Sequence, residues 1–286
     1  MILSYESGRM TEKKSYREAL RLEGSVSPIL SITGAGGKTT TALHLAYEYK
    51  DVGNPAVVMT STHLAIWDQP WFLLEESMEK LQQIRRRYGQ VWVGIPMTKR
   101  QKKEEFGGSL PMQKMKAVSE AFFKEICELG IPVIVEADGA RRMPCKVPAA
   151  HEPVIVPQTT TVCSVYGLDA IGQRICDCCF RSELAAEVLG KRKTDRLEAA
   201  DLAKIAADGN GGCKGVKRGM DHWVILKQSG HRSKKRIGRR SMPGIGTIRK
   251  PPDFDHVFRG NRAIGNVRAE TVKLRAKRGL TEHEKY

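Results

Sequence analysis

Short apolar runs alternate with segments of helical spacing along the first 226 positions of this chain. Such runs predict strands that are buried in a parallel sheet, and they occupy 29–32, 55–60, 91–94, 131–135, 154–156, 162–166 and 224–226. Apolar residues three or four positions apart predict core-facing helices, over 11–22, 38–49, 71–81, 115–129, 181–189 and 197–207, with Thr194 or Asp195 as the cap of the last. The pattern predicts an α/β fold, a mainly parallel sheet flanked by helices.

A glycine-rich turn joins the strand at 29–32 to the helix that follows it. The turn is Gly34, Ala35, Gly36, Gly37, Lys38, Thr39 and Thr40. Glycines let successive backbone N–H groups point into one hollow, and a helix N-terminus adds further donors. We expect these residues to bind a polyphosphate, with Lys38 reaching the β- and γ-phosphates and Thr39 binding Mg²⁺. Ile32 stands where the usual spacing has glycine, so the loop is a variant P-loop.

A second informative strand ends in carboxylates, at Glu136 and Asp138. Mg²⁺ on a nucleotide needs hard oxygen ligands, and the attacking water needs to be oriented. We therefore predict that Asp138 lies on the Mg²⁺ side, directly or through water, and that Glu136 supports it or positions water. The predicted catalytic residues are Lys38, Glu136 and Asp138, and the predicted cofactor is Mg²⁺ with ATP or GTP.

Six further residues are candidates for contact with substrate or phosphate: Thr62, His63, Arg141, Lys146, His151 and Glu152. Cations beside a triphosphate can stabilise charge that develops on transfer, but they can equally recognise an anionic substrate or face solvent. An acid–base pair of His151 with Glu152 is disfavoured, because neighbours on an extended chain point to opposite faces. The charged segment 98–108 is predicted to be a loop that closes over a ligand.

The net charge of +16 is concentrated in the last part of the chain. Residues 227–286 hold 17 Lys and Arg against 5 Asp and Glu, a net charge of +12, which leaves +4 for residues 1–226. No apolar run approaches the roughly 20 residues that span a bilayer, so we expect a cytoplasmic protein. Its seven cysteines are expected to be reduced thiols, and Cys176-Asp177-Cys178-Cys179 does not match the paired spacing of zinc sites.

Several blocks together resemble the selenium-dependent hydroxylase accessory protein family, also called YqeC-like. They are Ile32 to Thr40, Glu136 to Ala140 continuing through Lys146 and Pro148 to Ile155, Gly167 to Ala170, Gly211-Gly212 and Lys214 to Val216. The resemblance covers roughly residues 25–226. It implies a cytoplasmic P-loop protein that is associated with the maturation of molybdenum-containing hydroxylases.

The chain changes character after Val224-Ile225-Leu226. In GTPase-like P-loop proteins such a strand delivers Asn-Lys-x-Asp, whose Asp pairs with guanine, but here it runs into Lys227-Gln228-Ser229-Gly230-His231. The codons AAA CAA AGC GGA CAC, read one nucleotide later, give Asn-Lys-Ala-Asp. One hypothesis is therefore a frameshift from about Lys227 onward, and the alternative is a genuine basic extension. Both predict a poorly ordered tail, because few apolar groups offset the entropy of ordering.

The leading interpretation is a nucleotide-binding, NTP-hydrolysing accessory protein for maturation of a selenium-dependent molybdenum hydroxylase. Residues 1–24 would be a helical lead-in, 25–226 the P-loop domain and 227–286 the basic tail. Its partners would be the nucleotide and a molybdenum hydroxylase or its cofactor, with no membrane or nucleic acid. Two alternatives remain open: an ATP-dependent enzyme like the Mur ligases, whose phosphate loop is similar, or like kinases, and a basic nucleic-acid-binding protein.

Overall fold

The structure, a computed structural model, describes residues 2–6, 9–25, 27–98, 113–228 and 263–266. The predicted closing loop at 98–108, apart from its first residue, lies outside these ranges, as does most of the predicted tail. No helix in the described part is both long and apolar enough to cross a bilayer.

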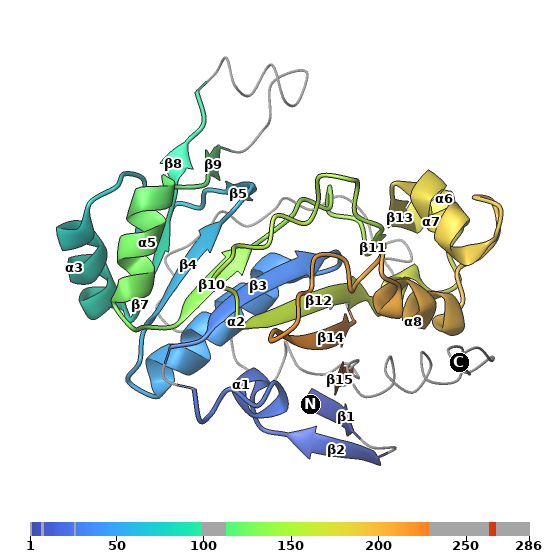
Figure 1. The fold of residues 1–286 in the computed structure, drawn as a ribbon, viewed down its shortest axis with the longest axis horizontal. Coiled ribbons are helices and arrows are strands. Elements are labelled where there is room, and N and C mark those ends of the chain that lie inside the picture. Colours follow the sequence, from blue (N-terminus) through green and yellow to red (C-terminus); the bar gives the residue numbers. More distant parts are fainter. Residues whose placement is uncertain (1, 7–8, 26, 99–112, 229–262, 267–286) are drawn as a thin grey trace, which may run out of the picture.

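Ten strands form the main sheet in the order β2-β1-β15-β14-β12-β3-β10-β4-β7-β6 (Figure 1). Their bounds are β1 Ile2–Glu6, β2 Arg9–Lys13, β3 Ile29–Gly34, β4 Ala56–Thr60, β6 Phe72–Leu73, β7 Gln90–Val93, β10 Val133–Glu136, β12 Thr161–Gly167, β14 Asp221–Lys227 and β15 Ala263–Asn266. Every neighbouring pair from β14 to β6 is parallel. The prediction of an α/β fold with a mainly parallel sheet is confirmed.

Helices cover both faces of this sheet. They are α1 Tyr16–Ala19, α2 Lys38–Asp51, α3 Met78–Tyr88, α5 Glu120–Glu128, α6 Ile175–Cys178, α7 Ser182–Leu189 and α8 Ala199–Ala207, with a 3-10 turn η1 at Leu168–Ala170. Figure 1 shows α6, α7 and α8 near the β12–β14 end of the sheet and α3 and α5 near its β7 end.

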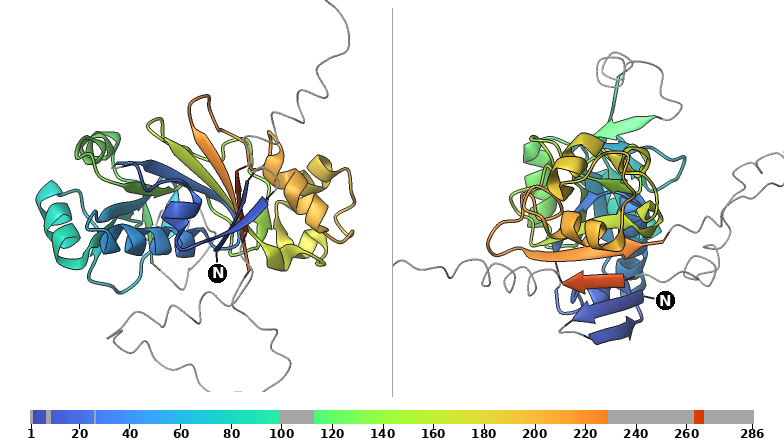
Figure 2. Two further views of the ribbon diagram at one scale, coloured as in Figure 1. Left: turned by 90° about the horizontal axis from the view of Figure 1, so that it is seen from below. Right: turned by 90° about the vertical axis from the view of Figure 1, so that its right-hand side faces the viewer.

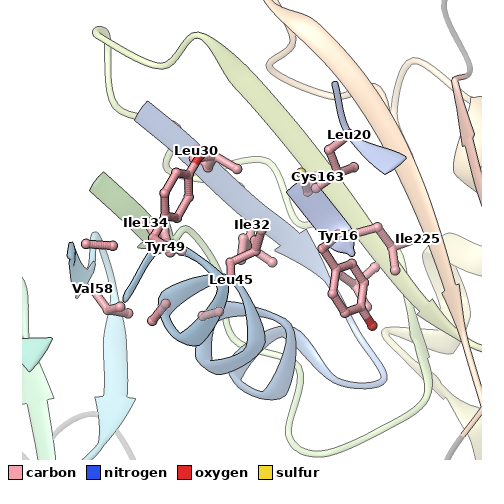
Figure 3. Close-up of a cluster of buried hydrophobic side chains, with 14 of the residues drawn as sticks. Tyr16, Leu20, Leu30, Ile32, Leu45, Tyr49, Val58, Ile134, Cys163 and Ile225 are labelled. Carbon is pink, nitrogen blue, oxygen red and sulfur yellow. The ribbon is translucent and has the colours of Figure 1, made fainter. Parts of the chain in front are cut away.

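Alternation along the strands explains why both faces are apolar. In β4, Val58 packs into the cluster that contains Leu45 and Tyr49 of α2, whereas its neighbour Val57 packs with Phe122 of α5. Successive side chains of a strand point to opposite faces, so a run without polar interruption serves two layers. Figure 3 shows the α2 cluster, in which Leu30, Ile32, Ile134 and Cys163 come from three adjacent strands.

Two small sheets lie beside the main one. One has the order β5-β9-β8, formed by β5 His63–Ala65, β8 Ile95–Pro96 and β9 Lys114–Lys116. The other pairs β11 Cys145–Lys146 with β13 Cys179–Phe180 in parallel. Residues 115 and 116 of β9 fall in the range predicted to be a helix, so that helix begins later than predicted.

Several predicted helices begin later than expected, because a serine side chain caps each one. Ser15 accepts a hydrogen bond from Glu18 N and starts α1, so the predicted helix at 11–22 is wrong for residues 11–13, which belong to β2. Ser77 and Ser119 likewise start α3 and α5. A hydroxyl at the N-cap satisfies an otherwise unpaired backbone donor. The apolar positions upstream, such as Trp71 and Met115, therefore lie outside these helices.

Two further predictions of local structure are corrected. Val154–Val156 forms no strand, because Val154 instead bonds the turn after β10, with its N–H donating to Ala137 O. The cap of α8 is Glu198, in a reciprocal capping box with Asp201, and neither Thr194 nor Asp195.

The sheet also extends past the predicted domain boundaries at 25 and 226. Lys227 belongs to β14, β15 pairs antiparallel with β14, and β1 and β2 follow at the same edge (Figure 2, right).

Candidate functional site

An open cleft of about 2060 Å³ lies at the carboxyl ends of the parallel strands. The segments after β3 and β4, at 36–40 and 61–63, line it together with the last residues of β10 and β12, Glu136 and Gly167. Chain order reverses here, since β3 is followed by β4 on one side and later by β12 on the other. Open parallel sheets bind their ligands at such a crevice.

The glycine turn packs directly against β12. Gly34 has a φ of 89°, and a Cβ there would lie 2.4 Å from Val165 O; Gly36 has a φ of 77°, and a Cβ there would lie 2.3 Å from Gly167 N. Both positions therefore need glycine for conformation and for space. Close strand packing thus accounts for part of the glycine signal that the sequence carries.

The backbone amides of the turn fall into two groups. Gly34 N donates to Asp138 Oδ2 at 3.0 Å, Ala35 N to Val165 O at 2.7 Å and Gly36 N to Met143 O at 3.0 Å. The next four amides, those of residues 37–40 at the start of α2, donate to no group in the described part of the chain. They are the unpaired donors of a helix N-terminus, and they lie at the cleft.

Five alternating charges run from the turn to α7, and we call them the ion-pair chain. Lys38 Nζ lies 3.2 Å from Asp138 Oδ1, and Asp138 Oδ2 lies 2.9 Å from Lys146 Nζ. Glu152 Oε2 then accepts from Lys146 at 2.7 Å and from Arg181 at 2.6 Å. Lys38 and Asp138 thus lie at the same end of the sheet, close enough to act in one site.

The middle of the ion-pair chain is buried. The side chain of Lys146 is 0% exposed and that of Asp138 1% exposed. Burial alone would raise the pKa of Glu152, but the hydrogen bonds from Arg181 and Lys146 outweigh it and hold that pKa below its ordinary value. Because a buried charge is tolerated only with partners, each member fixes the position of the next.

Glu136 forms a separate pair with the turn. Its Oε2 accepts from Thr39 Oγ1 at 2.8 Å, and its Oε1 lies 4.0 Å from Lys38 Nζ. Burial raises the pKa of Glu136, although Lys38 and Thr39 oppose the shift. The site therefore offers two hard oxygen donors side by side, which suits a cation such as Mg²⁺ that keeps several waters and phosphate oxygens as ligands.

The sequence model of the YqeC protein family matches residues 30–183, more than half of the chain. The chain belongs to the YqeC family. It is 25% identical over 209 residues to a protein of Escherichia coli (strain K12) described as uncharacterized protein YqeC, and the match covers 70% of this chain and 76% of that one. No solved structure matches. The range matched by the YqeC model includes every member of the ion-pair chain.

The other predicted site residues of this YqeC-family chain lie at several places around the cleft. Thr62, His63, Arg141 and His151 line it, and Thr62 N donates to Thr60 Oγ1. Lys146 does not line it, because it is buried behind the turn. Glu152 lines the cleft but bonds Lys146 and Arg181, so it joins distant segments.

Sequence reasoning missed several residues that line the cleft, namely Lys114, Lys116, Phe180, Arg181 and Lys227. Arg181 pairs with Glu152 across 29 positions of sequence, and Lys227 reaches Gly37 O across 190. No local pattern marks such pairs. Among the described residues, no group of three or more His, Cys, Asp and Glu side chains is arranged to hold a metal.

Proposed function

We propose that this protein binds a nucleoside triphosphate with Mg²⁺ on a variant P-loop and hydrolyses it. The observation that supports this most directly is the set of four amides at residues 37–40, which face the cleft without partners in the described structure. A helix N-terminus with unpaired donors and a positive dipole end attracts phosphate oxygens.

Lys38 carries one of these four amides and lines the cleft. It is 5% exposed, and its Nζ donates to Gly34 O at 2.8 Å while it pairs with Asp138. Asp138 keeps a second cationic partner in Lys146. Lys38 can therefore turn toward the β- and γ-phosphates without leaving a buried carboxylate unpaired.

For the metal we propose Thr39 and Glu136 as the protein ligands. Asp138 Oδ2 accepts a hydrogen bond from Gly34 N and pairs with Lys146. Asp138 Oδ1 lies 3.2 Å from Lys38 Nζ but has no hydrogen-bond partner in the described structure, whereas Glu136 already contacts the Thr39 hydroxyl. This exchanges the roles that the sequence suggested for the two carboxylates. Bound Mg²⁺ would neutralise charge on the phosphates, while Asp138 would position Lys38 and the turn.

The cellular role that we propose is maturation of a selenium-dependent molybdenum hydroxylase. It rests on the family resemblance and on the nucleotide site together. A second candidate is a transferase that passes a phosphoryl or acyl group to an acceptor, because the cleft exceeds the 300–1,000 Å³ or so of a pocket for one small ligand.

Nucleotide affinity of the wild type and of Lys38→Ala tests the proposal. We expect Lys38→Ala to weaken MgATP or MgGTP binding by roughly ten- to a hundredfold, the range for a charge-assisted contact. Lys124→Ala, at an exposed position of α5, is the matched control and should bind as the wild type does. Equal affinity in all three proteins would refute the phosphate-loop assignment.

Product analysis separates the two candidates. Release of inorganic phosphate without any added acceptor supports an NTPase, and turnover that requires an acceptor supports a transferase.

A further inference from the structure

The turn that follows β10 has an unusual composition for its conformation. Met143 N donates to Ala140 O at 2.9 Å, which closes a four-residue turn around Arg141 and Arg142. Their φ values are 46° and 63°. Positive φ at both central positions is the signature of a type I′ turn, where Asn and Gly are preferred because they tolerate it. The chain instead has two arginines there.

A third arginine that lines the cleft also has a positive φ. Arg181, the N-cap of α7, has a φ of 64°. In the described part of the chain, three of the four non-glycine residues with positive φ are these arginines, and all three line the cleft. Strained residues of this kind cluster at ligand clamps, which points to a ligand-binding role for these side chains.

Phe180 holds two of these arginines near each other. The guanidinium carbon of Arg181 lies 4.3 Å from the centre of the Phe180 ring, and that of Arg141 lies 5.1 Å from the same centre. Stacking on a ring that itself lines the cleft orients both planar groups. Arg181 is further fixed by Glu152.

The charges at this end of the cleft do not cancel. Lys38 and Lys146 balance Asp138 and Glu152 within the ion-pair chain. The three arginines and Lys227 remain, against two further carboxylates of the lining, Glu136 and Asp169. The surplus is two positive charges, which matches the charge of a phosphate monoester near neutral pH.

We propose that Arg141, Arg142 and Arg181 bind the phosphate group of a second substrate. Guanidinium forks suit phosphate oxygens. The arginine turn packs on the phosphate loop, because Gly36 N donates to Met143 O and a Cβ at Gly36 would lie 2.8 Å from Pro144 O. The inference deepens the proposed function, on which it rests for the nucleotide that would lie beside this second ligand.

Titration of the full chain with inorganic pyrophosphate tests the site, because the probe suits both the phosphate loop and the arginines. We expect two equivalents to bind the wild type and one to bind Lys38→Ala. The double variant Arg141→Asn, Arg142→Gly should also bind one equivalent of pyrophosphate tightly, and its affinity for the second equivalent should fall by at least about tenfold. Arg192→Ala, an exposed arginine outside the cleft, is the control and should bind two.

The double variant separates binding from folding. Asn-Gly is favoured in a type I′ turn, so its unfolding midpoint should equal or exceed that of the wild type. If it does not fold, Arg141→Gly alone serves in its place.

The outcomes distinguish the two proposals. A single equivalent that Lys38→Ala removes and the turn variant leaves unchanged overturns the arginine site but not the nucleotide site. A single equivalent that both variants weaken assigns the arginines to the nucleotide and likewise overturns the inference. Binding that only the turn variant weakens supports the arginine site and refutes the phosphate loop, and no binding at all refutes both.

Discussion

The polar groups in front of the glycine turn and those behind it differ in how they are satisfied. In front, the amides of residues 37–40 face the cleft and have no partner in the described structure. Behind, the ion-pair chain is paired at every step. A second buried group, Thr33, Ser164 and His222, is also paired, with Ser164 Oγ at 3.0 Å from Thr33 Oγ1 and 2.9 Å from His222 Nε2.

This difference suggests a division of labour. Groups that are buried and mutually paired fix the shape of the turn, and removing one leaves its partner without compensation. Groups that lack partners at a cleft are available to a ligand, and they contribute little to the folded state alone. Substitutions behind the turn should therefore lower stability, whereas substitutions in front should lower affinity.

Lys146→Ala should show the largest effect on stability. It removes the cation that Asp138 and Glu152 share, but Asp138 keeps Lys38 and Glu152 keeps Arg181. The cost should therefore lie at the lower end of the about 3–5 kcal/mol for breaking a buried pair. Urea unfolding measures the loss. Lys191→Ala is the control, because its pairs with Asp201 and Glu198 are partly exposed and removing them should lower the free energy of unfolding much less. Similar losses of stability in both variants would contradict the proposal that the groups behind the turn determine stability.

His222 should make stability depend on acid pH. Burial lowers its pKa from 6.5 to about 4, so the folded state favours the neutral ring. The resulting stability is fully present above pH 6.5 and is lost as the pH falls toward 4, by about 3 kcal/mol over that range. His222→Gln should remove this part of the pH dependence in unfolding experiments. His151→Gln, at an exposed position, is the control and should retain the pH dependence of the wild type. If His222→Gln shows the same pH dependence as the wild type, His222 is not its source.

The front of the turn was largely predictable from sequence, and the back was not. Gly34 to Thr40 are contiguous, and the strand before them and the helix after them follow from local apolar patterns. The ion-pair chain joins residues 38, 138, 146, 152 and 181, which only the folded sheet brings together. Sequence analysis identified Lys146 and Glu152 as candidates, but it expected them to contact a ligand.

The strands of the sheet likewise differ in how well the sequence predicts them. Strands β3, β4, β10 and β12 are rich in apolar residues and were predicted close to their observed bounds. Strand β1, with Ser4 buried in it, and β15, drawn from the predicted tail, were not predicted. Their place is set by pairing with β14 and with each other, which is a tertiary interaction that no local period encodes.

Gly36→Ala tests how tightly the glycine turn packs against β12. A Cβ at Gly36 would lie 2.3 Å from Gly167 N, which is backbone and cannot move aside cheaply. Gly53→Ala is the matched control, because Gly53 has a similar φ of 74° but open space around it. We expect Gly53→Ala to cost about 1 kcal/mol through strain alone, and Gly36→Ala to cost about 2 kcal/mol more. Equal losses in thermal or urea unfolding would show that the turn can shift away from β12.

Thr39→Val should have the smallest effect on stability and act mainly on affinity. It keeps the shape of the side chain but removes the hydroxyl that bonds Glu136, at a stability cost of about 1 kcal/mol. Nucleotide binding in the presence of Mg²⁺ should weaken by roughly tenfold, while binding in EDTA should hardly change.

Thr40→Val is the control for this prediction, because Thr40 is exposed one position farther along α2 and its hydroxyl contacts no carboxylate in the described chain. A Thr39→Val protein that loses affinity equally with and without Mg²⁺ would place the metal elsewhere. The Thr39–Glu136 pair would then be one of the mutually paired groups that fix the shape of the turn. The groups available to a ligand would begin only at Thr40.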